Sequence, residues 1–198
     1  MYDFTTLRPR RGMGAEKWST FEAMDVDNPA LVPYSVADME FAAAPQITAA
    51  IQKAASFGVY GYTTADGPYR RAVCRWMARR HGWTVEPEWM FQTFGVVPAM
   101  NLAVHALTQP GEGVIIQPPV YPPFRRVVEN TGRRVWENPL KLENGRYVMD
   151  LEGLAALAAR PDVKLFFLCS PHNPVGRVWT RAELQAAAEI CARHGGTV

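Results

Sequence analysis

Residues 165–176 read Leu-Phe-Phe-Leu-Cys-Ser-Pro-His-Asn-Pro-Val-Gly, and this stretch decides the fold. It begins as an unbroken apolar run, which is typical of a strand buried on both faces of a parallel sheet. Two prolines and the Asn-Pro-x-Gly sequence then end the run in a fixed loop. Ligands of open α/β sheets bind beyond the carboxyl ends of the strands. Asn173 therefore presents an amide at the expected ligand edge, although a simple Asn-Pro turn explains the motif equally well by itself.

The first segment, residues 1–45, has no sustained periodicity of apolar residues and resembles an arm. Strands and helices alternate along the rest of the chain. Apolar periodicity and turn residues predict helices at residues 47–57, 68–81, 100–107, 124–130, 151–159 and 180–194. They predict strands at residues 90–94, 114–116, 133–137 and 165–168, with a hairpin turn at Asn144-Gly145. The alternation favours an α/β fold, a three-layer, doubly wound and mostly parallel sheet. Because Thr197-Val198 resembles the start of another strand, we expect an incomplete sheet and a piece of a larger protein.

The composition excludes several classes of function. A net charge of +2 over 198 residues offers no electrostatic basis for binding nucleic acid or an anionic membrane. No apolar run approaches the roughly 18 residues that a membrane helix needs, and no apolar segment follows the basic residues of the arm as in a secretory signal. The three cysteines, Cys74, Cys169 and Cys191, are odd in number and far apart, which fits a reducing compartment. We therefore expect a cytoplasmic protein whose partner is a small molecule.

Three loops that follow predicted strands should meet at one edge of the sheet. Val96 and Val97 open a helix, where free backbone N–H groups and the helix dipole favour an anion such as phosphate. Tyr121 lies in a loop with four prolines, from which its ring could stack on a flat ligand. The amide of Asn173 could hydrogen-bond a ring oxygen. Singly, these features also suit an ordinary helix start, a packed tyrosine and a turn, but together they predict a pocket for pyridoxal 5'-phosphate.

Other cofactor and catalytic motifs are missing from the sequence. There is no G-x-G-x-x-G after a strand and no G-x-x-x-x-G-K-[ST], so nucleotide sites of those two kinds are unsupported. The four histidines do not pair with the cysteines at metal-binding spacing, and we expect no metal site. No G-x-S-x-G is present, which argues against a serine hydrolase.

The chain resembles the N-terminal half of a fold-type-I pyridoxal-phosphate enzyme of the aminotransferase class I/II superfamily. Within it, the chain is similar to the MalY/PatB group of cystathionine β-lyases, or C–S lyases. The Cys-Ser-Pro-His-Asn-Pro-Val-Gly-Arg-Val-Trp sequence is a superfamily feature, whereas Val-Ala-Asp-Met-Glu-Phe and Gly-Val-Tyr-Gly-Tyr point to the lyase group. The segments that carry the resemblance are residues 2–4, 36–41, 58–62, 95–99, 119–124 and 169–179.

The resemblance implies a set of residue roles and two regions. Val96 and Val97 would bind the cofactor phosphate, Tyr121 would stack on the pyridine ring, and Asn173 would bond its phenolic oxygen. Tyr62 would reach the phosphate of a neighbouring subunit, which implies a homodimer. The Val36-Ala37 backbone would hold the carboxylate of an amino-acid substrate. Residues 1–45 would form an arm and a small-domain segment, and residues 46–198 the first part of the cofactor-binding domain.

The resemblance also implies a reaction and what this chain lacks for it. The parent protein would be a C–S β-lyase that releases a thiol, pyruvate and ammonia. The Schiff-base lysine and the acid that pairs with the pyridine nitrogen would lie beyond Val198, so the chain alone should be inactive. Two alternatives stay open, a class I/II aminotransferase and a non-catalytic remnant or folding fragment.

Overall fold

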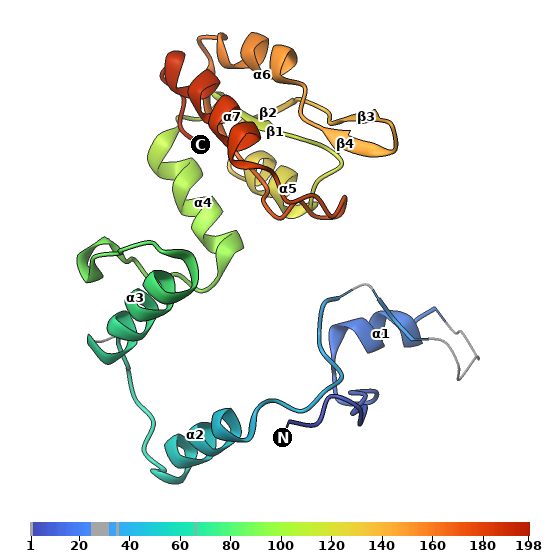
Figure 1. The fold of residues 1–198 in the computed structure, drawn as a ribbon, viewed down its shortest axis with the longest axis vertical. Coiled ribbons are helices and arrows are strands. Elements are labelled where there is room, and N and C mark those ends of the chain that lie inside the picture. Colours follow the sequence, from blue (N-terminus) through green and yellow to red (C-terminus); the bar gives the residue numbers. More distant parts are fainter. Residues whose placement is uncertain (1, 25–31, 35, 66) are drawn as a thin grey trace. The chain divides into compact units, whose positions relative to one another are not determined.

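The structure is a computed structural model that describes residues 2–24, 32–34, 36–65 and 67–198. It contains two compact units, Met1–Thr64 and Ala65–Val198, which are coloured from blue to red along the chain in Figure 1. Each unit is described by itself. The expected division into residues 1–45 and 46–198 concerns the role of each region and stays a prediction.

The first unit holds two helices and an extended segment. Helix α1 spans Glu16–Glu22 and α2 spans Pro45–Ser56. Gly58, with a φ of 71°, follows α2 where the sequence predicts a stop. The buried side chain of Lys17 anchors the segment after α1, because its Nζ donates to the Asp38 carbonyl at 2.9 Å and pairs with Glu40 at 2.8 Å.

The second unit contains a parallel sheet in the order β2-β1-β5. Strand β1 spans Gly113–Ile116 and is buried throughout, because β2, Arg134–Glu137, pairs with one side and β5, Val163–Phe166, with the other. On the far side of β5, Thr197 forms a parallel bridge with Leu165. This single bridge is the strand-like pairing expected at Thr197-Val198.

Helices cover both faces of this sheet (Figure 1). Helices α4, Val96–Leu107, and α5, Pro123–Asn130, pack on one face, and the core there consists of Val104, Val114, Val127, Val128 and Leu165. Helices α6, Leu151–Ala158, and α7, Arg181–Arg193, pack on the other face, with a core that includes Ile115, Leu154, Phe166, Ala187 and Ile190. The neighbours along each strand thus point to opposite faces, and the expected three-layer α/β fold is confirmed.

Local sequence signals set several element boundaries. Thr180 and Glu183 form both halves of a capping box at the start of α7, as predicted. Asp150 accepts a hydrogen bond from the Gly153 N–H at 3.1 Å and caps α6. Asn144 and Gly145 take φ angles of 48° and 76° in the turn between β3, Lys141–Glu143, and β4, Arg146–Val148.

The predicted strand at residues 90–94 is wrong. Helix α3 spans Gly67–His81, a 3-10 helix spans Pro87–Trp89, and residues 90–95 form neither helix nor strand. The strand pattern was present, but a strand also needs a neighbour, and no described segment pairs with these residues. Phe91 and Phe94 are consequently exposed.

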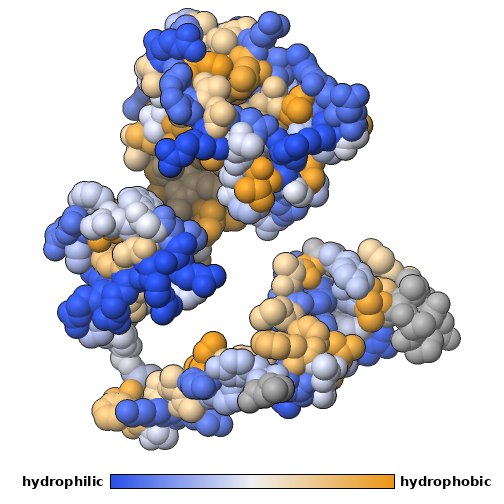
Figure 2. Space-filling model, viewed as in Figure 1, coloured by the Kyte–Doolittle hydropathy of each residue, from blue (hydrophilic) through white to orange (hydrophobic). Residues whose placement is uncertain are grey.

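Helix α3 carries a basic face. Its exposed arginines include Arg71, Arg75, Arg79 and Arg80, and Figure 2 shows hydrophilic side chains gathered over this helix. Across the described residues, no helix is both long enough and apolar enough to cross a bilayer.

Gly113→Ala should destabilise the second unit. The added methyl group would overlap the indole of Trp136 and approach Val163 Cγ2 at 3.1 Å, in a strand buried on both sides. Overpacking of this kind costs about 1–3 kcal/mol in the free energy of unfolding, measurable by urea denaturation. The control is Gly196→Ala, whose methyl group meets its nearest neighbour at 3.5 Å. Equal stability of the two variants would contradict the packing described for β1.

Glu40→Gln should remove a pH-dependent stabilisation of the first unit. The main cause that lowers the pKa of Glu40 below its ordinary value is the hydrogen bond from Lys17, and burial acts in the opposite direction. The pair therefore stabilises the folded chain above the ordinary pKa of glutamate and loses its effect as the pH falls. Hydrogen exchange at the Arg8 amide, which donates to the Glu40 carbonyl at 2.7 Å, should differ between variant and wild type at about pH 7 and converge near about pH 3. Glu22→Gln, in an exposed pair with Arg11, serves as the control and should show no such gap.

Candidate functional site

Helix α4 begins with two backbone donors that have no acceptor within the helix. The first intrahelical bond runs from the Ala99 N–H to the Gly95 carbonyl, at 3.1 Å. The residues between them are Val96, Val97 and Pro98, and proline has no N–H. Val96 and Val97 therefore supply the free donors of the first turn, where the helix dipole adds positive potential. Gly95, with a φ of 125°, turns the chain into this helix. The arrangement suits an anion.

A hollow of about 500 Å³ lies between α4 and the end of β5. Val96 and Met100 line it from α4, Phe124 from α5, and Leu168 from the segment after β5. The start of α4, the first turn of α5 and the segment that leads to the Asn173 loop thus border the same space. Its walls are mostly apolar, and it extends along α4 to Leu107 and to Thr197 and Val198 at the open side of β5.

Tyr121 is three residues before Phe124 in the sequence, but it lines a different hollow. Tyr121 is 43% exposed and borders a hollow of about 270 Å³ together with Ile116 and Arg126. The Phe124 N–H donates to the Tyr121 carbonyl at 3.0 Å and fixes the turn into α5. The structure therefore brings α5, which follows this loop, against α4, and the stacking role of the Tyr121 ring stays a prediction.

Asn173 is exposed in a loop held by short-range bonds. The His172 N–H donates to the Arg177 carbonyl at 2.7 Å, and the Gly176 N–H donates to the His172 carbonyl at 2.8 Å. The Asn173 N–H contacts Cys169 Sγ at 3.5 Å. Its side-chain amide projects from a defined backbone, as a ligand contact requires, and that contact stays a prediction.

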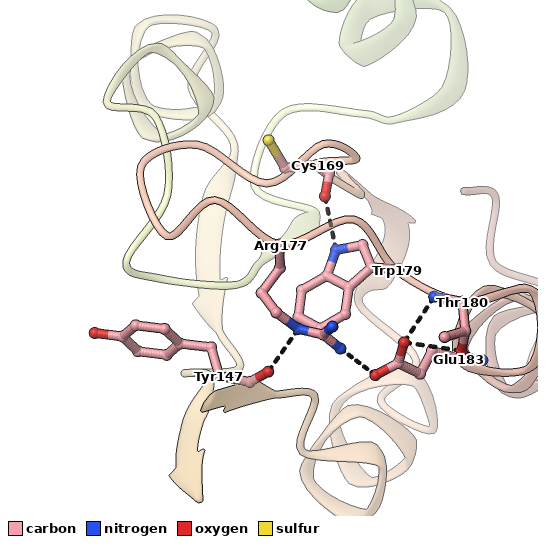
Figure 3. A network of polar contacts seen from close by, with 6 residues as sticks. All are labelled: Tyr147, Cys169, Arg177, Trp179, Thr180 and Glu183. Atoms are coloured by element: carbon pink, nitrogen blue, oxygen red, sulfur yellow. Dashed lines mark hydrogen bonds and ion pairs between the residues drawn. The ribbon is translucent and has the colours of Figure 1, made fainter. Parts of the chain in front are cut away.

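A polar network connects the two ends of the Asn173 loop with neighbouring elements (Figure 3). The buried Arg177 guanidinium donates to the Tyr147 carbonyl at 2.8 Å, pairs with Glu183, and lies 4.4 Å from the Trp179 ring centroid. Trp179 Nε1 donates to the Cys169 carbonyl at 2.9 Å. Burial opposes ionisation of Glu183, but hydrogen bonds from Thr180 and the charge of Arg177 hold its pKa below the ordinary value. The network ties this loop to β4 and to the start of α7.

His172 is a feature that the sequence analysis missed. Its side chain is 1% exposed, and Nε2 lies 3.0 Å from the Pro119 carbonyl oxygen. Its ring meets Trp179 edge to face at 5.6 Å. Burial is the main cause that lowers the pKa of His172. The sequence analysis considered this histidine only as a metal ligand and rejected that role. In the described part of the chain there is no group of three or more metal-binding side chains.

Three of the expected site residues belong to the first unit. Val36, Ala37 and Tyr62 are all exposed and lie outside helices and strands. The Lys17 contacts with Asp38 and Glu40 fix the backbone directly after Val36-Ala37. The substrate and subunit contacts expected of these residues stay predictions.

Comparison with known proteins supports one family. Residues 32–198 match the family described as aminotransferase class I and II. The chain is 44% identical to "Cystathionine beta-lyase PatB" of Bacillus subtilis, over 99% of this chain and 50% of that protein. It is 31% identical to "Protein MalY" of Escherichia coli, over 98% of this chain and 50% of that protein. The chain therefore spans about half the length of these curated relatives.

A solved structure agrees with these relatives. Cystalysin from Treponema denticola, whose crystal structure contains pyridoxal 5'-phosphate, superimposes with a TM-score of 0.94 at 39% identity, over 99% of this chain and 50% of that one. The match covers residues of both units. The parallel sheet of the second unit belongs to an α/β fold like that of this pyridoxal-phosphate protein. The chain belongs to the aminotransferase class I and II family.

Proposed function

We propose that residues 1–198 form the part of a pyridoxal-phosphate C–S β-lyase that holds the phosphate and ring of the cofactor. The observation that carries this is the start of α4, where the N–H groups of Val96 and Val97 have no acceptor among the described residues and Pro98 has no N–H. Two donors aligned with a helix dipole can bind phosphate oxygens without a charged side chain. The half-exposed Tyr121 ring and the exposed Asn173 amide offer the further contacts that a polar aromatic ring needs.

The chain's own residues bind and orient, whereas the electron chemistry belongs to the cofactor. When bound, pyridoxal phosphate supplies an electron sink for the charge that develops at the substrate α-carbon. The Asn173 side chain would donate to the phenolic oxygen, and Tyr121 would cover one face of the ring. The Val36-Ala37 backbone would hold the substrate carboxylate. Tyr62 would contact the phosphate in a second subunit, so the active assembly is a homodimer in the cytoplasm.

The lysines of this chain do not serve for covalent capture of the cofactor. Lys17 pairs with Glu40 and Lys141 pairs with Asp150. Lys53 lies on α2, and Lys164 lies in β5 before the ligand edge. None of the four is among the described residues that line the hollow at α4. The lysine and the acid that complete the site would come from chain beyond Val198.

The substrate follows from the names of the relatives. Cystathionine is a cysteine-type amino acid with a sulfur on its β-carbon, and β-elimination followed by hydrolysis gives a thiol, pyruvate and ammonia. The family also includes aminotransferases, which return a proton to the cofactor and pass the amino group to a keto acid. That makes an aminotransferase the second candidate function.

Val96→Pro should weaken binding of pyridoxal phosphate to the chain. The substitution removes one donor, and proline is well tolerated at the first position of a helix, here after a Gly95 with a ψ of 176°. Losing one hydrogen bond to a charged group corresponds to about tenfold or more in the dissociation constant, measured by equilibrium dialysis. Val96→Ala keeps the N–H and should bind as wild type does. Equal affinity of all three forms would rule out this helix start as the phosphate site.

Activity separates the candidate functions. The purified chain given pyridoxal phosphate and cystathionine should release no pyruvate, because it lacks a capturing lysine. The complete product of the gene that encodes residues 1–198 should release pyruvate without any keto acid. Glutamate formation that depends on 2-oxoglutarate would show an aminotransferase instead. If the complete product does neither, the protein is a non-catalytic remnant, and turnover by the chain alone that a lysine substitution abolishes would show that the site has been misplaced.

A further inference from the structure

His172 joins two loops that are far apart in the sequence. Its ring reaches the Pro119 carbonyl at 3.0 Å across a separation of 53 residues. Pro119 stands two residues before Tyr121, and His172 stands directly before Asn173. The imidazole also interacts with the Gln117 backbone, so both of these contacts lie in the segment before Tyr121. The bond therefore links the two loops that carry the expected ring contacts.

The chemistry of the bond assigns the state of the imidazole. A carbonyl oxygen can only accept, so Nε2 carries the hydrogen and Nδ1 is the bare nitrogen. Nδ1 is buried and finds no hydrogen-bond partner in the described structure. A second proton would have to enter this dry position, and burial lowers the pKa of the ring accordingly. Burial thus favours the neutral ring with its hydrogen on Nε2.

Each end of the bond has its own support. On one side, His172 is fixed by its backbone bond to Arg177 and by the edge of Trp179. On the other side, the Leu140 N–H donates to the Pro118 carbonyl at 2.8 Å, and the Phe124 N–H donates to the Tyr121 carbonyl. Neither set of bonds relates one loop to the other. The pairing of β1 with β5 brings the loops to one edge, and beyond the strand ends the imidazole contacts relate one loop to the other.

We propose that His172 is a positioning residue, whose Nε2–H bond to Pro119 sets the distance between the Tyr121 and Asn173 loops and thereby the fit of a flat phosphorylated ligand. The identity of the ligand depends on the proposed function, whereas the effect of His172 on the spacing of the loops does not. His172 touches neither the cofactor nor the substrate in this scheme. It acts through the residues that flank it.

The test compares two substitutions in the full 198-residue chain. His172→Leu keeps an apolar bulk but removes the donor, whereas His172→Gln keeps an N–H at similar reach. In the leucine variant, hydrogen exchange at the Val120 and Tyr121 amides should be about tenfold faster, and the dissociation constant for pyridoxal phosphate should rise about tenfold. The glutamine variant should restore both to near wild type. Exchange at the buried Ile115 amide should not change, which separates a local effect from general loosening.

The outcomes discriminate between this inference and the proposed function. Unchanged exchange at residues 120–121 in the leucine variant would overturn the positioning role, as would a glutamine variant that behaves like the leucine variant. If the leucine variant does not fold, the imidazole nitrogen shifts of the wild-type chain decide, because a hydrogen on Nδ1 instead of Nε2 contradicts the bond. If wild type and variants all fail to bind pyridoxal phosphate, the cofactor proposal fails, while the exchange data still decide the role of His172.

Discussion

The parallel pairing of β1 with β2 and β5 is the constraint on which the second unit depends. It buries β1 completely and divides the core between α4 and α5 on one face and α6 and α7 on the other. Since all three strands run the same way, their carboxyl ends share one edge, and the loops that follow β1 and β5 leave the sheet there. The placement of Tyr121 and Asn173 is therefore a consequence of strand direction.

Hydrogen bonds and ion pairs then fix the positions of the loops at this shared edge of the sheet. Burying a charged group such as the Arg177 guanidinium is costly unless its donors are satisfied, and here a carbonyl, a carboxylate and an aromatic face satisfy it. Gln117 and Asn138, both buried at the ends of β1 and β2, bond each other at 2.8 Å. His172 adds the bond between loops. Rigid backbone with exposed amides and rings at its tips is the arrangement that a small ligand requires.

Short-range rules account for what the sequence predicted well. The capping box at Thr180, the Asp150 cap and the Asn144-Gly145 turn each depend on a few neighbouring residues, and all three occur. The buried strands were visible as apolar runs, and the family motifs were visible as fixed strings. These signals were sufficient for the fold class and for the family.

The failures involve partners that the sequence does not specify. Residues 90–94 have strand character but no described neighbour to pair with. Burial of His172 depends on Pro119 and Trp179, which are distant or not adjacent in the chain, so nothing local marked it. Tyr121 was placed in the right loop, but its ring borders a second hollow. The contacts expected of Val36, Ala37 and Tyr62 stay predictions, because these exposed residues have no local pattern that names a partner.

The central claim is that the loops at this edge form one site for pyridoxal phosphate. The most direct test is a titration of the isotope-labelled chain with pyridoxal phosphate, followed by amide chemical shifts. The account predicts saturable shifts at Val96 and Val97 together with Tyr121 and Asn173, and no shifts at Ala187, which is buried in the core on the α6 and α7 face. Saturable shifts confined to other residues, or none at Val96 and Val97, would contradict it.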